Sequence, residues 1–192
     1  REPWWMVGLI FVWGAVGGAG FGCVCNTTII AAVSSILGET EAAWIGPVIV
    51  APLVEEVTKI IPLFILSLLR HFDNATDGLI YGAACGLGFA MTENISYFYS
   101  AGANGGVGAM AATIIVRTMF TAQVHCSASA SWGFILGAMR YRNPLLRWLV
   151  APPLGYLIAA TIHAFWNGSA TYASLNQATD VQMGAFAVIV GI

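Results

Sequence analysis

The sequence predicts an all-α membrane protein, a polytopic transmembrane helical bundle with five complete spans and the start of a sixth. The first observation is composition: 58% of the 192 residues are hydrophobic and only 8% are charged, whereas a soluble domain carries about 25% charged residues. The second is that apolar runs recur at about the 20-residue length that an α-helix needs to cross a bilayer. Because no basic stripe is present, we expect the lipid bilayer and no nucleic acid as a partner.

The expected spans follow from these apolar runs in order. They are Trp4 to Leu37, Ala42 to Leu69, Gly78 to Ala101, Val107 to Met139, Trp148 to about Tyr172, and a last one that starts near Met183. The first run has 34 residues, so we expect its helix to be strongly tilted or broken near Asn26 to Thr28.

Glycines at four-residue spacing occur in two of these runs, at Gly14, Gly18 and Gly22 and again at Gly78, Gly82 and Gly86. Small residues on one helical face let two backbones approach closely, so these positions predict helix packing contacts.

Basic residues outside the spans share one side of the predicted topology. They are Arg1, Arg70, Arg140, Arg142 and Arg147, and the other connections contain none. The positive-inside rule then places Arg1 and residues 70–77 and 140–147 in the cytoplasm. We treat residues 1–192 as a single transmembrane domain, and we expect it to be trimmed at one or both ends because it ends inside an apolar run.

Seven ionisable residues interrupt the apolar runs: Glu55, Glu56, Lys59, Glu93, Arg117, His125 and His163. Left unpaired, their five formal charges would cost on the order of 15 kcal/mol in the bilayer, so they must find partners. Four of them lie at matching depth: Glu56 is 14 residues before Arg70, Glu93 16 after Asp77, His125 15 before Arg140 and His163 16 after Arg147. At 1.5 Å per residue each lies roughly 21–24 Å from the cytoplasmic boundary, which predicts one site on four helices.

Spacing within each helix adds detail. Lys59 follows Glu55 by four residues and Glu56 by three, so its ammonium can reach either carboxylate. Asn94 follows Glu93 directly, and Asn167 shares a helical face with His163. Pro52, upstream of the glutamates, frees a backbone carbonyl, which membranes tolerate only where it faces protein or water.

Such a set suits hydrolysis by an activated water. In one version Glu93, His125 and His163 bind zinc, and Glu55 or Glu56 accepts the proton of the water. In the other no metal binds, a glutamate activates water directly, and His163, Asn167 or Asn94 stabilises the oxyanion. In both versions Lys59 and Arg117 balance charge. An ion-coupled transporter would also bury such residues, and a noncatalytic scaffold is a third reading.

The stretches "APLVEEVTK" (51–59), "DGLIYGAACGLGFAMTENISYF" (77–98) and "IHAFWNGSA" (162–170), with His125 in between, resemble the PrsW family of intramembrane proteases. The resemblance implies paired catalytic glutamates at Glu55 and Glu56, a site residue at Glu93 and two essential histidines at His125 and His163. It also implies a multi-pass protein of the bacterial plasma membrane that cleaves membrane-associated proteins, of the anti-sigma-factor type. The family is commonly classed as metalloproteases, while its CAAX endopeptidase relatives resemble metal-free glutamate proteases.

Overall fold

The described part of the chain is entirely helical. The computed structural model describes residues 2–69 and 71–176 and contains no strand among them. Its elements are α1 (Trp4–Val12), η1 (Trp13–Gly18), α2 (Ala19–Leu37), α3 (Glu39–Ile45), η2 (Gly46–Val50), α4 (Ala51–Leu66), α5 (Ala75–Val116), η3 (Arg117–Thr121), α6 (Ala122–Ala138), η4 (Leu145–Val150) and α7 (Ala151–Asn176), where η marks a π-helical segment.

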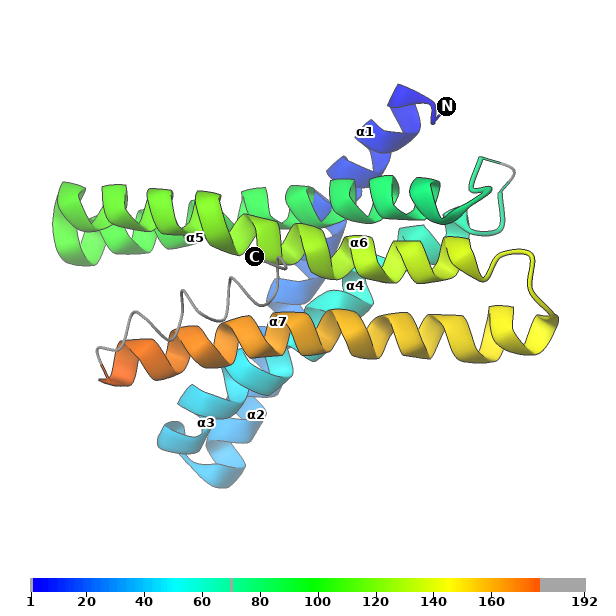
Figure 1. Cartoon of the computed structure of the whole chain (residues 1–192). Helices are drawn as coiled ribbons and strands as arrows, with labels where there is room; N and C mark the ends of the chain where they lie inside the picture. The colour runs from blue at the N-terminus through cyan, green and yellow to red at the C-terminus, as the bar shows by residue number, and fades with distance from the viewer. Residues whose placement is uncertain (1, 70, 177–192) are drawn as a thin grey trace.

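Three helices within the described residues are long and apolar enough to cross a membrane. They cover Trp4–Leu37, Ala75–Ala138 and Leu145–Ser174. The middle one is not straight, because Gly106 has φ 73° and ψ −170° and divides it into two arms that lie side by side (Figure 1). The segment from α3 to α4, which carries charged residues, lies between the first and second of these helices in the sequence and is not one of the three. The span expected from Met183, as well as Arg1 and Arg70, lies outside the described residues.

Of the two forms expected for the first long helix, strongly tilted or broken near Asn26 to Thr28, the structure excludes the break. The helix continues without interruption through Asn26 to Thr28, and its irregular stretch is the π-helical segment η1 instead. The chain then reverses at Gly38, whose φ of 103° is accessible to glycine at little cost.

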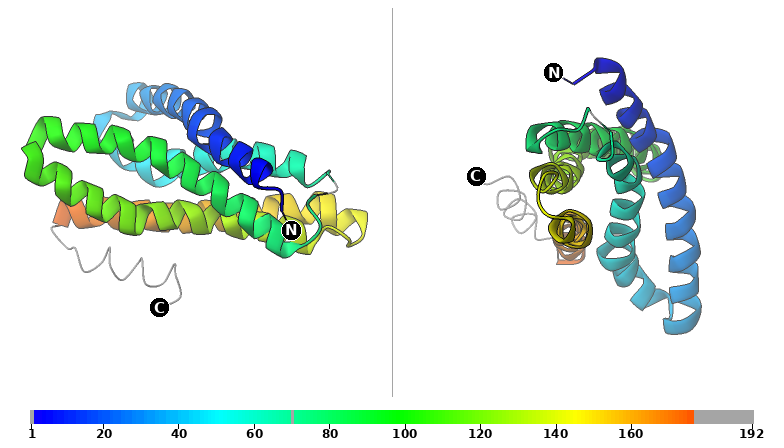
Figure 2. Two further views of the ribbon diagram at one scale, coloured as in Figure 1. Left: turned by 90° about the horizontal axis from the view of Figure 1, so that it is seen from above. Right: turned by 90° about the vertical axis from the view of Figure 1, so that its right-hand side faces the viewer.

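The helices form two groups that cross obliquely. The arms of α5 and α6 and helix α7 lie roughly parallel, while α1 to α2 and α3 to α4 form a second antiparallel pair across them (Figures 1 and 2). Helix α4 lies between the groups and contacts α2, α5, α6 and α7. A charged residue on α4 can therefore reach partners on every major helix.

The second glycine series forms close helix contacts at all three positions, as the spacing predicts, whereas in the first series only Gly14 does, and a Cβ on Gly18 or Gly22 would lie at ordinary van der Waals distance from the Phe89 side chain. A Cβ atom on Gly78, Gly82 or Gly86 would overlap the carbonyl oxygen of Gly133, Ser129 or His125 of α6, respectively. A Cβ on Gly14 would likewise overlap the Cys85 carbonyl. These contacts hold α5 against α6 at the level of His125.

The two connections that carry basic residues lie together at one end of the molecule (Figure 1). Arg140 donates hydrogen bonds to the carbonyl oxygens of Ser67 and Leu69. Next to them, the Asn74 side chain accepts hydrogen bonds from the backbone N–H groups of Thr76 and Asp77 and so caps α5.

Candidate active site

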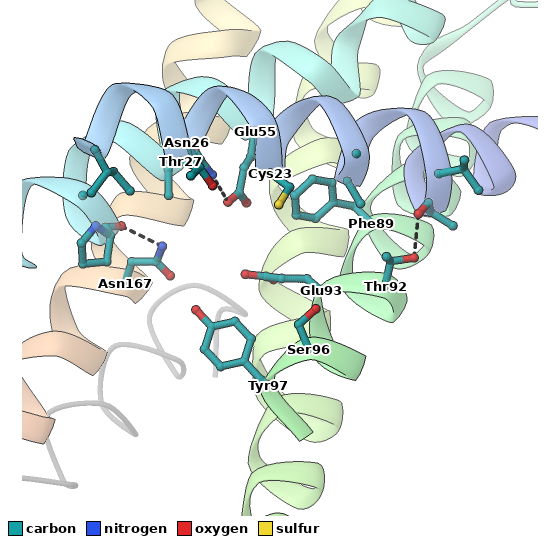
Figure 3. A pocket seen from close by; sticks show the side chains of 18 residues that line it. Cys23, Asn26, Thr27, Glu55, Phe89, Thr92, Glu93, Ser96, Tyr97 and Asn167 are labelled. Carbon is teal, nitrogen blue, oxygen red and sulfur yellow. Dashed lines mark hydrogen bonds between the residues drawn. The ribbon is translucent and has the colours of Figure 1, made fainter. Parts of the chain in front are cut away.

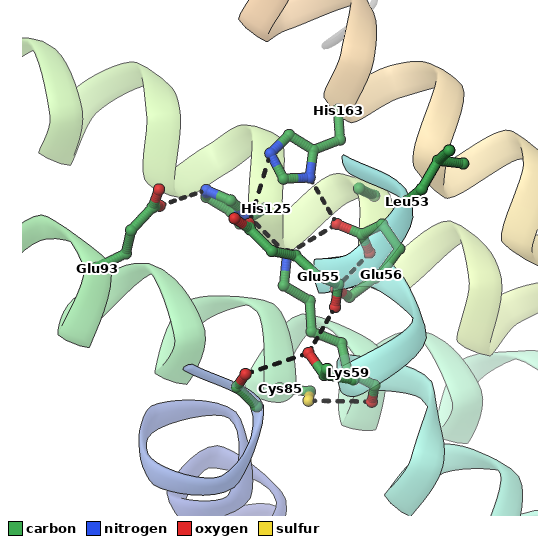
Figure 4. Close-up of polar contacts among 12 residues, drawn as sticks. Leu53, Glu55, Glu56, Lys59, Cys85, Glu93, His125 and His163 are labelled. Atoms are coloured by element: carbon green, nitrogen blue, oxygen red, sulfur yellow. Dashed lines mark hydrogen bonds and ion pairs between the residues drawn. The ribbon is translucent and has the colours of Figure 1, made fainter. Parts of the chain in front are cut away.

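Helix α4 supplies the buried charges of the site. Glu56 and Lys59 are 0% exposed and Glu55 is 5% exposed. Lys59 Nζ lies 2.7 Å from Glu56 Oε1, so the predicted i,i+3 pair forms, and Ser129 of α6 contributes a 3.5 Å hydrogen bond to Glu56 Oε2. Glu56 is thus held from two helices and lies fully inside the protein (Figure 4).

The two histidines complete this network from α6 and α7. His163 Nδ1 lies 2.9 Å from Glu56 Oε1. Because an ionised carboxylate only accepts hydrogen bonds, Nδ1 of His163 carries a proton, and in a neutral imidazole Nε2 is then the atom with the lone pair. That Nε2 atom lies 3.8 Å from Glu55 Oε2.

His125 has the opposite tautomer. Lys59 Nζ lies 2.8 Å from its Nδ1, and because an ammonium only donates, Nδ1 accepts and Nε2 carries the proton. Nε2 in turn lies 2.9 Å from Glu93 Oε2. The two imidazole rings meet edge to face, with centroids 4.6 Å apart.

Glu93 occupies the edge of the cluster. Arg117 donates from Nη2 to Glu93 Oε2 at 2.9 Å and from Nε to Asn94 Oδ1 at 2.7 Å. The guanidinium also stacks on Tyr97, 3.6 Å from the ring centroid. Arg117 is therefore the ion-pair partner of Glu93, and Lys59 is that of Glu56.

Glu55 differs from the other two glutamates. Its Oε1 accepts a 3.0 Å hydrogen bond from Asn26 Nδ2 of α2, whereas Oε2 is buried with no hydrogen-bond partner in the described part of the chain. Glu55 also lines a cavity of about 760 Å³, which Glu56 does not.

Asn167 takes a backbone role beside the site. In the π-helical segment η2 each N–H bonds to the carbonyl five residues earlier, as the Ala51 N–H does to Gly46 O. The next carbonyl, that of Pro47, would pair with the N–H of residue 52, which is a proline and has none. Asn167 Nδ2 donates to this free Pro47 oxygen at 2.9 Å. Pro52 does free a carbonyl near the site, and the Asn167 amide satisfies it.

Two cavities meet at this cluster. The first, of about 760 Å³, lies between η1, α2 and α5 (Figure 3). The second, of about 290 Å³, extends toward Arg117 and Thr171. The two cavities adjoin, because four residues line both: Pro47, Glu93, Tyr97 and Asn167.

The donor set fits a metal ion in residue type and distance. One ligand atom each from Glu55, His125 and His163 lies within 4.8 Å of the others, and two imidazoles with a carboxylate are common catalytic zinc ligands. His163 is oriented for this by Glu56, as metal-binding histidines usually are by a carboxylate. His125 would first have to release the proton that it shares with Glu93.

The structure brings all seven predicted ionisable residues into one connected network. The predicted ligand Glu93 contacts His125, but the tightest group of potential ligands contains Glu55 in its place. Sequence reasoning missed Asn26 and Tyr97 as parts of the site. The available signal for Asn26 was that it is a polar residue in the apolar first run. This signal shows neither where the side chain points nor what it binds.

Comparison with known proteins identifies the family of the chain. The model of the PrsW family of intramembrane metalloproteases matches residues 2–192. The chain belongs to the PrsW family. With its long apolar helices, it is therefore a multi-pass membrane protein of a protease family.

Two curated relatives match this PrsW family member. It is 29% identical over 99 residues to Protease PrsW of Bacillus subtilis (strain 168), covering 50% of this chain and 40% of that protein. It is 26% identical over 168 residues to Protease PrsW of Oceanobacillus iheyensis, covering 86% of this chain and 70% of that protein. The aligned part thus spans less than half of the Bacillus protein. No solved structure matches significantly.

Proposed function

We propose that this PrsW family member is an intramembrane endopeptidase that hydrolyses peptide bonds of membrane proteins with the Glu and His cluster. The observation that carries the proposal is the position of Glu55. Its side chain lines a cavity of about 760 Å³, and its Oε2 atom has no hydrogen-bond partner among the described residues and lies 3.8 Å from Nε2 of the buried His163. A buried carboxylate oxygen without a donor is suited to accept a proton from water.

Each residue has a separate role in this proposal. Glu55 is the general base, because it reaches the cavity while Glu56 is enclosed by Lys59, Ser129 and His163. Glu56 orients His163 through Nδ1, and Lys59 offsets the Glu56 charge.

Arg117 balances Glu93 at the cavity edge and orients Asn94. Asn167 holds the Pro47 carbonyl in place by a hydrogen bond. Because its side chain also lines the cavity, we propose that it stabilises the developing oxyanion.

We further propose that zinc is bound by His125 and His163 with Glu93, as the sequence predicts, which leaves Glu55 free as the base. Because a Glu55 oxygen lies within 4.8 Å of ligand atoms of both histidines, the variants below test it as the alternative third ligand. When bound, zinc would lower the pKa of a coordinated water and polarise the scissile carbonyl. In a mechanism without metal, Glu55 would still be the proton acceptor, in the same position.

The base assignment is tested by Glu55→Gln and Glu56→Gln in purified, reconstituted protein with a single-span membrane substrate. We expect Glu55→Gln to lower kcat at least 100-fold, in line with the usual contribution of general base catalysis, at nearly unchanged melting temperature. Glu56→Gln should lower both activity and melting temperature. Cleavage at the wild-type rate by Glu55→Gln would refute its role as the base.

Metal dependence is tested by elemental analysis and chelation. We expect one zinc per chain, lost in His163→Ala and in His125→Ala, with activity restored to chelated wild type by added zinc. Comparing Glu93→Gln with Glu55→Gln identifies the third ligand, since only the ligand variant should lose metal. Full activity without metal would establish the metal-free version.

The membrane arrangement that we propose has five crossings in the described residues and a sixth beyond them, in one domain over residues 1–192. Clustering of Arg140 and Arg147 beside Ser67 supports a cytoplasmic location for that end. By family resemblance, we propose the bacterial plasma membrane as location and anti-sigma-factor-type proteins as substrates.

A further inference from the structure

We propose that the cavity between α2 and α5 binds an extended apolar segment of the substrate, and that Asn26 both positions Glu55 and accepts a backbone N–H of that segment. This inference rests on the proposed peptidase activity, and it adds a binding surface and a residue outside the Glu and His cluster. It places substrate recognition partly on the first long helix.

The cavity has two facing walls. One is formed by a stripe of mostly small residues on η1 and α2, namely Val16, Gly20, Cys23 and Thr27, and the other by Phe89, Glu93, Ser96 and Tyr97 of α5 (Figure 3). The first wall is exposed at all four positions. Because the small side chains leave room at Gly20 and Cys23, the space extends from the exposed face of α2 to Glu55.

The length of this wall suits a short extended peptide. Val16 and Thr27 are eleven residues apart along the helix, which corresponds to roughly 16 Å at 1.5 Å per residue. An extended chain rises about 3.3 Å per residue, so the wall is long enough for about five substrate residues. A helical substrate must unwind before it is cleaved, because the helix keeps the scissile amide in intrahelical hydrogen bonds.

Two buried polar atoms of residues that line the cavity favour one kind of occupant. Asn26 uses Nδ2 to bind Glu55 Oε1, and its Oδ1 is buried without a partner among the described residues, as is Glu55 Oε2. Both free atoms are acceptors, and an unmade buried hydrogen bond costs about 1–3 kcal/mol. An extended peptide brings N–H donors together with apolar side chains, whereas an acyl chain brings no donor.

Asn26 is therefore a positioning residue for the base and a contact for the substrate. Its amide fixes Glu55 Oε1, so that Oε2 is the free oxygen that lies toward His163. The same amide offers Oδ1 to the peptide backbone, which couples the position of the base to the presence of substrate.

The proposed substrate groove, which is the cavity between α2 and α5, is tested by Gly20→Leu with Gly8→Leu as the matched control. Both glycines are exposed on the same long helix, and a Cβ on either meets no atom within 4 Å, but only Gly20 lines the cavity. We expect Gly20→Leu to raise KM for a single-span substrate at least 10-fold with little change in kcat, while Gly8→Leu behaves as wild type. Equal KM values for both variants would overturn the groove assignment.

Binding is measured separately by photo-crosslinking, which does not require cleavage. A single-span apolar peptide carrying benzoylphenylalanine should form adducts on residues 16–27 and 89–97 of the wild type, and fewer on Gly20→Leu. Adducts confined to other surfaces, or displacement of the peptide by phospholipid alone, would refute the proposal. Adducts in the groove without any cleavage would refute the peptidase function and keep the binding site.

The role of Asn26 is tested by Asn26→Ala in the same assays. We expect kcat to fall at least 10-fold and KM to rise, because both the base and the peptide lose a contact, while the melting temperature stays near that of wild type. Asn26→Gln, which keeps both amide atoms, should recover part of kcat. A variant Asn26→Ala with unchanged kcat and KM would exclude both roles.

Discussion

At the scale of the residue, Lys59 is the group on which the buried charges depend most. Its ammonium contacts Glu56 and His125 and lies 4.1 Å from the centroid of the Phe89 ring. Removing one partner of a fully buried ion pair leaves an uncompensated charge, which typically costs about 3–5 kcal/mol. Lys59→Met should therefore destabilise the protein by about that amount, measured by thermal unfolding in detergent.

The matched control is the double variant Lys59→Met with Glu56→Gln. Since it removes both charges, it should be more stable than Lys59→Met alone. If Lys59→Met unfolds at the wild-type temperature, the ion pair does not stabilise the fold.

At the scale of the element, the close approach of α5 to α6 sets the position of His125. A Cβ on Gly86 would overlap the His125 carbonyl, so Gly86→Ala must push α6 away from α5. We expect a loss of about 1–3 kcal/mol, as for other overpacked sites, together with reduced cleavage, measured by thermal unfolding and by activity. Gly108→Ala on the same helix is the control, because its Cβ meets nothing within 4 Å; equal effects of the two changes would contradict this account.

These helices also show how far sequence reasoning reaches. Glycine spacing predicted the α5 to α6 contact, and counting residues from the basic connections predicted that Glu56, Glu93, His125 and His163 converge. Both follow from helix geometry alone. The π-helical segments, the link from Asn167 to Pro47 and the contact from Asn26 to Glu55 were not predictable, because each depends on how neighbouring helices rotate and on which backbone groups remain unpaired.

At the scale of the whole molecule, the proposed topology places the bend of α5 at Gly106 and the connection at residues 139–144 on opposite sides of the membrane. We expect Asn104→Cys, but not Tyr141→Cys, to react with a membrane-impermeant maleimide added outside intact cells, in a background with the native cysteines replaced by alanine. Both side chains replaced are exposed. After permeabilisation both should react, and labelling of Tyr141→Cys before it would reverse the proposed orientation.

The central position of α4 has a consequence for how such proteins diverge. Glu56 binds both Lys59 and His163 at the point where helices α4, α6 and α7 meet. A descendant that lost one of them would retain an unpaired charge or imidazole in the bilayer. We therefore expect catalytically silent descendants of this fold to have replaced the three together by apolar residues, and partial sets to be counterselected for folding before activity is considered.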